Sequence, residues 1–149
     1  MAPTRIVVGV DLSEEARKAS ELAMSLASTL GAEVLLIMAY LNPMPVSRGT
    51  GFSALAEADR AKNRAWEALS GLSAGLENVA GVRPKTRAIL GDAAAVIQEA
   101  AEEGEESTLV VVGRRGMGGM RRFVLGSVSS DVLRSASGPV LIVPAPDGA

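Results

Sequence analysis

The chain has 149 residues, 48% of them hydrophobic, and a formal net charge of −2. This length suits one domain spanning residues 1–149, and the small net charge predicts no partnership with nucleic acid or an anionic membrane. Cysteine and histidine are absent, which excludes disulfides and removes the usual general base at neutral pH. No apolar run reaches the roughly 18 residues of a membrane helix, and no signal-peptide layout is present, so we expect a cytoplasmic protein.

The first forty residues predict a strand, a helix and a second strand. Residues 5–10 form a short β-branched run that is typical of a buried strand. Ser13 is a favourable N-cap, and apolar residues then recur at helical spacing until Gly31, which is expected to end the helix. Residues 34–40 form the second apolar run, so the two strands stand about one βαβ unit apart.

The rest of the chain continues this alternation. Residues 42–53 are rich in turn formers and predict a loop. A long helix is expected over residues 54–76, with Leu55 on its inward face and Trp66 as a packing residue. Further helices are expected to start at Gly91–Asp92 and to cover residues 128–136, and three further strands are expected at residues 84–90, 109–112 and 140–143.

Continuous apolar strands that alternate with amphipathic helices indicate an α/β fold. We predict a Rossmann-like, open, parallel five-stranded sheet in the order 3-2-1-4-5, with helices on both faces and right-handed crossovers. Ligands of such sheets bind beyond the carboxyl ends of the strands, where the strand order reverses. Asp11 and Gly113 follow the first and fourth strands, so the sequence predicts a site between them.

The most informative motif is a glycine-rich segment between the fourth strand and the last helix. Its spacing is Gly113-x2-Gly116-x9-Gly126-Ser127. Glycines allow a close backbone approach to phosphate, and the free N–H groups of a helix start favour an anion. Ser127 stands at the expected N-cap of that helix. The motif therefore predicts a phosphate site, with a plain surface loop as the alternative. Positive potential comes from Arg114, Arg115, Arg121 and Arg122, although charge runs are usually solvated.

Two common phosphate motifs are absent. The chain has no Gly-Lys-Ser/Thr sequence, so it is not a P-loop protein, and no G-x-G-x-x-G follows the first strand. The spacing that is present resembles the ATP-binding subclass of the universal stress protein family, which carries G-x2-G-x9-G followed by Ser or Thr. The resemblance covers nearly the whole chain, from the strand and acidic turn at residues 6–13 to the closing strand at residues 138–143. Thr108 and Arg114 depart from the family pattern, where Asp and Ser or Thr are common.

The resemblance implies a set of residues that bind ATP, with or without Mg²⁺. Gly9 and Asp11 would meet the adenosine end, and the backbone of Ala39 would contact adenine. Asp11 also fits a purely structural role, as a turn residue beside a helix. The residues implied around the ribose and phosphates are Val112, Gly113, Arg115, Gly116, Gly126, Ser127, Val128 and Ser129.

Three functions remain open at this stage. The first is an ATP-binding stress-response protein that acts as a homodimeric, nucleotide-dependent switch. The second is a slow, metal-assisted ATPase, which the missing histidine and cysteine bases disfavour. The third is a partner-binding module with a vestigial loop. We expect no catalytic residues and no metal site of the protein's own. A homodimer is expected through Val140–Val143, because an apolar edge strand is an aggregation hazard unless paired.

Overall fold

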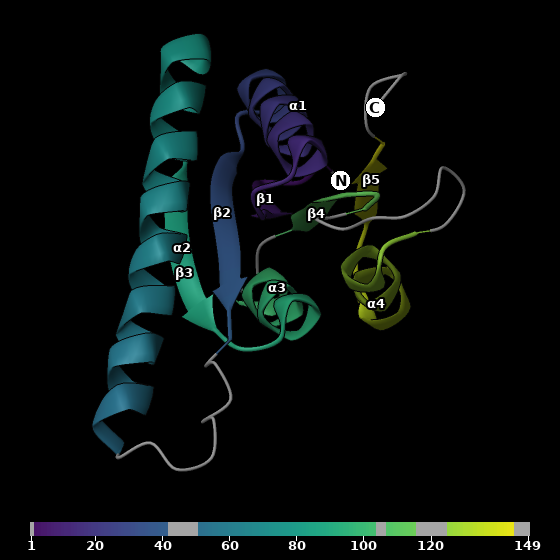
Figure 1. Cartoon of the computed structure of the whole chain (residues 1–149). Coiled ribbons are helices and arrows are strands. Elements are labelled where there is room, and N and C mark those ends of the chain that lie inside the picture. The colour runs from purple at the N-terminus through teal and green to yellow at the C-terminus, as the bar shows by residue number, and fades with distance from the viewer. Residues whose placement is uncertain (1, 42–50, 104–106, 116–124, 145–149) are drawn as a thin grey trace.

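The computed structural model describes residues 2–41, 51–103, 107–115 and 125–144, with only the backbone of residues 51–54. Strands and helices alternate through this part of the chain (Figure 1). The elements are β1 (Arg5–Gly9), α1 (Glu14–Leu30), β2 (Glu33–Tyr40), α2 (Gly51–Ala80), β3 (Lys85–Leu90), α3 (Ala93–Glu102), β4 (Thr108–Gly113), α4 (Ser127–Ser135) and β5 (Val140–Val143).

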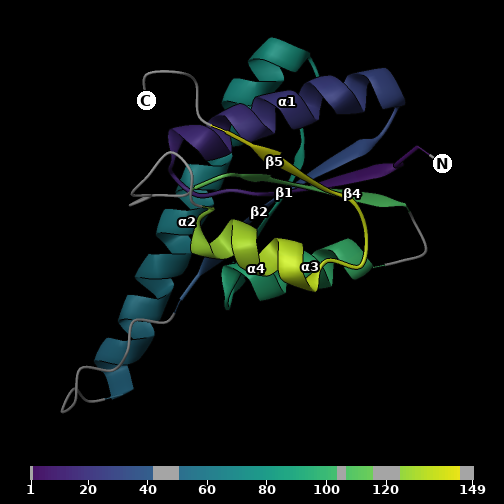
Figure 2. The same cartoon turned by 90° about the vertical axis from the view of Figure 1, so that its right-hand side faces the viewer.

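The five strands form one parallel sheet in the order β3-β2-β1-β4-β5, which confirms the predicted topology. Val8 of β1 stands opposite Leu36 of β2 and Val111 of β4. The chain moves from β1 outward to β3 and then returns to the other side of β1, so the strand order reverses between β1 and β4. Helices α1 and α2 cover one face of the sheet, and α3 and α4 cover the other (Figure 2).

Both faces of β1 are buried. Ile6 and Val8 point into the cluster under α1 and α2, whereas Val7 points into the cluster under α3 and α4. All three side chains are fully buried. This explains why the strand is a continuous apolar run, because both alternating faces of a central parallel strand meet helices. Each such side chain contributes about 1.5–3 kcal/mol through burial.

The two predicted ends of α1 are confirmed. Ser13 accepts a hydrogen bond from the N–H of Ala16 at 3.1 Å, and Gly31 has a φ of 68°. A φ in the left-handed region favours glycine, because other residues meet a steric penalty there. These local signals fix where α1 begins and ends, and therefore hold its first turn beside the carboxyl end of β1.

Helix α2 is longer than predicted, and two of the residues expected to pack against the core are exposed. It begins at Gly51, so residues 51–53 are helical, while the rest of the predicted loop lies outside the described residues. Leu55 and Trp66 are 70% and 53% exposed, so the prediction that they pack inward is wrong. The first turns of α2 extend past the sheet (Figure 1). Ala65 is buried, and Trp66 is turned about 100° away from it around the helix.

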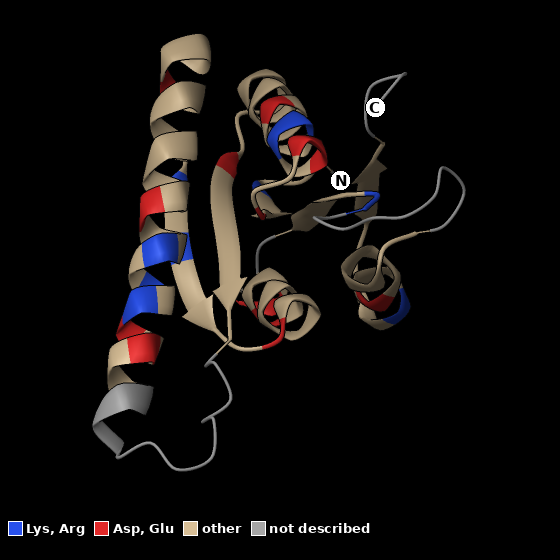
Figure 3. Ribbon diagram, in the orientation of Figure 1, with Lys and Arg blue, Asp and Glu red and all other residues tan. Residues whose placement is uncertain are grey.

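The charged residues of the described chain are concentrated on the helices, whereas β2 carries its one charge, Glu33, at its first position (Figure 3). No helix in the described ranges is long and apolar enough to cross a membrane.

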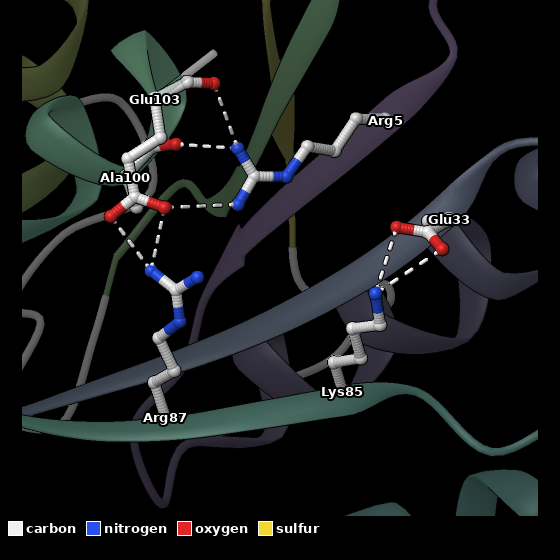
Figure 4. Close-up of polar contacts among 6 residues, drawn as sticks. All are labelled: Arg5, Glu33, Lys85, Arg87, Ala100 and Glu103. Atoms are coloured by element: carbon white, nitrogen blue, oxygen red, sulfur yellow. Dashed lines mark hydrogen bonds and ion pairs between the residues drawn. The ribbon is translucent and has the colours of Figure 1, made fainter. Parts of the chain in front are cut away.

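A polar cluster closes the amino-terminal side of the sheet (Figure 4). Arg5 is nearly buried and donates to the carbonyl oxygens of Ala100 at 2.9 Å and Glu103 at 3.3 Å. Arg87 donates to both carboxylate oxygens of Glu103 at 2.8 Å. Arg5 therefore satisfies carbonyls at the end of α3, where a helix has no intrahelical donors left for them.

Candidate functional site

A cavity of about 360 Å³ lies at the carboxyl ends of β1, β2 and β4, where the strand order reverses. This volume is within the range of small-ligand pockets, about 300–1,000 Å³. Its walls come from these strand ends and from the first turns of α1, α3 and α4. The described residues that line it are Gly9, Val10, Asp11, Ser13, Ala16, Ile37, Ala39, Ala93, Ile97, Val112, Gly113, Arg115, Gly126, Ser127, Val128 and Ser129.

The structure brings ten of the eleven predicted site residues together around this cavity. They come from four separate stretches of the chain, at residues 9–11, 39, 112–115 and 126–129, and meet because parallel strands end at the same edge of the sheet. The eleventh, Gly116, lies outside the described residues. The ten are Gly9, Asp11, Ala39, Val112, Gly113, Arg115, Gly126, Ser127, Val128 and Ser129.

Sequence reasoning missed the apolar wall that α3 provides. Ala93 and Ile97 line the cavity and stand four residues apart, on one face of the helix. Asp92 caps α3 by accepting from the N–H of Ala95 at 3.0 Å. Ile97 packs over Gly9 so closely that a Cβ on Gly9 would overlap its Cδ1 atom. The helical spacing after Asp92 was a usable signal, because that helix begins next to the strand ends.

Besides the start of α3, the N-termini of α1 and α4 border the cavity. Ser13 and Ala16 come from the start of α1, and Ser127 and Val128 from the start of α4. The backbone N–H groups of a helix start carry partial positive charge and favour an anion. The N-cap of α4 is Gly126 and has no side-chain cap bond. Helix α4 thus begins at Ser127, one residue earlier than predicted, and the prediction that Ser127 is the N-cap is wrong.

The backbone of Arg114 closes the base of the glycine-rich segment. Its carbonyl oxygen accepts from the N–H of Gly126 at 2.8 Å and from the hydroxyl of Ser129 at 2.7 Å. Its own N–H donates to the carbonyl oxygen of Val143 at 2.8 Å. These hydrogen bonds hold residues 114 and 126 together. The hydroxyl of Ser129 donates its hydrogen to the carbonyl oxygen of Arg114.

Arg115 is paired with Glu15, which lies in the first turn of α1. Its N–H donates to a carboxylate oxygen of Glu15, and its Nε lies 3.5 Å from the other oxygen. The two side chains are 13% and 8% exposed. No local sequence pattern predicts this pair, because its two residues are 100 positions apart in the chain.

Asp11 makes a turn and also lines the cavity. Its Oδ1 accepts from the N–H of Ser13 at 2.8 Å, which makes a tight turn between β1 and α1. The same residue lines the cavity and is half-buried. Its carboxylate is therefore held in a fixed orientation at the wall of the site.

A parallel sheet with a cavity at the reversal of its strand order defines a Rossmann-like ligand-binding domain. The model of the Universal stress protein family matches residues 3–144, and the chain belongs to this family. It is 34% identical over 140 residues to a universal stress protein of Thermus aquaticus, covering 93% of this chain and 96% of that protein. A universal stress protein of Mycobacterium tuberculosis is 31% identical over 137 residues, and there the match spans 92% of this chain but 44% of the relative.

Solved structures show the same fold. The hypothetical protein MJ0577 has a TM-score of 0.83 at 20% identity, covering 99% of this chain and 100% of that chain. A universal stress protein in complex with cAMP has a TM-score of 0.69 at 24% identity, covering 97% and 98%. One from Archaeoglobus fulgidus in complex with dAMP has a TM-score of 0.60 at 22% identity, covering 96% and 99%.

Proposed function

We propose that this chain is a single-domain, ATP-binding regulatory protein of the cytoplasmic stress response. The observation that carries the proposal is the convergence of ten of the expected site residues on one cavity bordered by the N-termini of α1, α3 and α4. Two structural relatives in complex with cAMP and dAMP support an adenine nucleotide as the ligand class. The glycine-rich motif favours a nucleotide with more than one phosphate.

The cavity has an apolar part and a polar part, which matches the two ends of a nucleotide. Gly9, Ala39 and Ile97 offer an uncharged surface for adenine. Gly126 and Ser127 lie at the positive end of α4, where phosphates are stabilised by backbone N–H groups. Asp11, held by its turn, is oriented to accept hydrogen bonds from ribose hydroxyls.

The residues present fit binding better than turnover. The chain has no histidine or cysteine to act as a base, and helix N–H groups bind the phosphates of the ground state. Equal binding of substrate and transition state does not accelerate a reaction. Mg²⁺ would enter with the phosphates and neutralise part of their charge. We therefore propose a switch that is read by its occupancy, with hydrolysis at most slow.

A homodimer through β5 is part of the proposal. β5 is an edge strand, and its residues from Val140 to Ile142 are only half-buried. The carbonyl oxygen of Val143 accepts from the N–H of Arg114, the residue after β4, so by alternation Ile142 turns its backbone groups to the open edge. If the β5 strands of two protomers paired across a two-fold axis, these outward backbone N–H and C=O groups would be hydrogen-bonded. Ile142→Pro removes an outward N–H without taking a hydrogen bond from β4, so light scattering should show a folded monomer.

The proposed site can be tested with a substitution that places a bulky side chain in the cavity. Ala93 lies on the first turn of α3 and lines the cavity, whereas Ala95 lies on the same turn and is exposed. Calorimetry should show that Ala93→Trp weakens ATP and adenosine more than tenfold, an effect of at least about 1.4 kcal/mol. Ala95→Trp should bind like the parent.

Two further measurements separate the alternatives. Thermal stabilisation of the parent by ATP is expected for a nucleotide switch and not for a partner-binding module with a vestigial loop. Phosphate release above about one turnover per second would favour an enzyme instead. Chromatography of nucleotide released from natively purified protein identifies the ligand.

A further inference from the structure

Glu15 occupies an unusual place for an acidic residue in the first turn of a helix. Its neighbour Glu14 is exposed, paired with Arg17, and has a pKa lowered by the hydrogen bond from that guanidinium. Glu15 is instead buried, 6% exposed, and points to the segment after β4. A buried carboxylate is costly unless it is paired and hydrogen-bonded, so its partner matters.

Arg115 approaches this carboxylate with one hydrogen bond, from its backbone N–H, and with the charge of its guanidinium. The N–H of Arg115 donates to one oxygen of Glu15, and the guanidinium Nε stands 3.5 Å from the other. Arg115 lines the cavity, whereas the cavity wall, as far as the structure describes it, does not include Glu15. The carboxylate therefore lies behind Arg115 as seen from the ligand, and it balances the positive charge that Arg115 brings to the site.

Gly113 makes this approach possible. A Cβ placed on Gly113 would stand 3.0 Å from Cβ of Glu15 and 3.2 Å from its carbonyl carbon. The absence of a side chain there lets the first turn of α1 lie directly against the end of β4. The close packing of backbone and side chain shows that the Glu15–Arg115 contact belongs to the folded core of the site.

We infer that Glu15 is a specificity-determining residue that competes with the ligand's phosphates for Arg115 and so limits how strongly the site prefers the more highly charged nucleotides. The inference rests on the proposed nucleotide site. Without Glu15, both the N–H and the guanidinium of Arg115 would be available to phosphate, and the site would carry one more net positive charge. With Glu15 in place, each added phosphate of the ligand gains less binding free energy from Arg115.

Glu15→Gln is the decisive variant, because glutamine keeps an acceptor for the N–H of Arg115 and removes only the charge. A unit charge several ångströms from a phosphate in a partly buried site changes affinity by about tenfold or more. Calorimetry should therefore show ATP binding about tenfold tighter than in the parent, ADP by a smaller factor, and adenosine within about twofold. The matched control is Glu14→Gln, which removes an exposed charge from the same helical turn and should leave the ratio of ATP to adenosine affinity unchanged.

A second comparison keeps the inference testable where the Glu15→Gln variant does not fold. Arg115→Gln leaves the carboxylate without its cation, and ATP should bind more weakly while adenosine changes little. Adding Glu15→Gln to this variant makes the pair neutral and should tighten ATP again. The inference is wrong if Glu15→Gln leaves the ratio of ATP affinity to adenosine affinity unchanged both in the parent and in the Arg115→Gln variant.

The outcomes separate the inference from the proposed function. A parent that binds neither adenosine nor ATP removes the proposed function and the inference with it. A parent that binds both, with Glu15→Gln showing the parent's ratio, leaves the proposed function intact and shows that Glu15 only supports the fold.

Discussion

The hydroxyl of Ser129 donates to the carbonyl oxygen of Arg114 at 2.7 Å and thereby ties the first turn of α4 to the end of β4. The same carbonyl accepts the N–H of Gly126. One carbonyl thus joins the two ends of the glycine-rich segment. The start of α4 is held at the edge of the cavity by this contact, and a phosphate bound there would depend on it.

Ser129→Ala should destabilise the protein by about 1 kcal/mol, because a buried hydrogen bond is lost while Gly126 still serves the carbonyl. ATP binding should weaken a few-fold and adenosine binding should change less, since the start of α4 becomes less well positioned. Urea unfolding and calorimetry measure the two effects. Ser135→Ala is the control, because Ser135 makes an exposed 2.8 Å bond to Asp131 in the same helix. Equal losses in both variants would contradict a special role for Ser129.

Gly113→Ala should cost about 1–3 kcal/mol, the usual range for overpacking, because the new Cβ would press on the backbone of Glu15. The first turn of α1 would have to move away from β4. Gly71→Ala is the contrasting variant. Gly71 lies within α2 with open space around a new Cβ, so this change should stabilise the protein by about 0.5–1 kcal/mol. Urea midpoints that shift in the same direction for both variants would refute the steric argument.

The sheet and its order follow from the sequence because central parallel strands must be apolar on both faces. The caps of α1 were also predictable, since Ser13 and Gly31 act through local geometry. The exposure of Leu55 was not. Helical periodicity cannot tell where a long helix leaves the sheet, as the start of α2 does (Figure 1), and Leu55 near that start is 70% exposed. Local signals thus predicted the elements but not the extent of their packing.

In the candidate site, too, some features could be predicted from the sequence and others could not. Residues at strand ends were found because the topology places them at one edge of the sheet. The Glu15–Arg115 pair was missed, because it joins residues that only the folded chain brings together. The position of Ser127 was misjudged by one residue, since Gly126 adopts the extended conformation of an N-cap with φ of −65° and ψ of 165°. Contacts across the fold depend on tertiary packing, which no sequence pattern records.

Gly9→Ala should destabilise the protein and weaken adenosine binding. The added Cβ would overlap Ile97 and stand 3.2 Å from Cγ1 of Val112. Overpacking of this kind costs about 1–3 kcal/mol, and a displaced Ile97 would narrow the cavity. Ile97→Val removes the overlapping methyl group, so the double variant should be more stable than the two single losses predict. Additive losses in a double-mutant cycle would show that Ile97 does not restrict Gly9.

Asp11 can be tested for its two roles with two substitutions. Asp11→Asn keeps an oxygen that accepts from the N–H of Ser13, so its stability should stay within about 0.5 kcal/mol of the parent, as for a neutral surface change. Asp11→Ala loses the turn and should cost about 1 kcal/mol. Calorimetry should show that Asp11→Ala weakens adenosine and ATP by the same factor. A loss confined to ATP would place Asp11 at the phosphate end instead.

The ion pairs of Glu103 predict a pH dependence of stability. Hydrogen bonds from Arg87, together with the charges of Arg87 and Arg5, lower the pKa of Glu103 below its ordinary value. A carboxyl with a lowered pKa in the folded state adds stability above its unfolded pKa, about 4.3. That contribution is lost as the pH falls through the lower, folded value.

Glu103→Gln should therefore lower the free energy of unfolding at pH 7, and the difference from the parent should shrink as the pH falls below about 4. The effect should stay near or below about 1 kcal/mol, because the Glu103 side chain is 45% exposed and solvent screens its pairs. Urea unfolding at a series of pH values measures it. Glu99→Gln removes one charge from the exposed side of the same helix and controls for net charge. A difference between parent and Glu103→Gln that grows toward low pH would contradict the sign of this linkage.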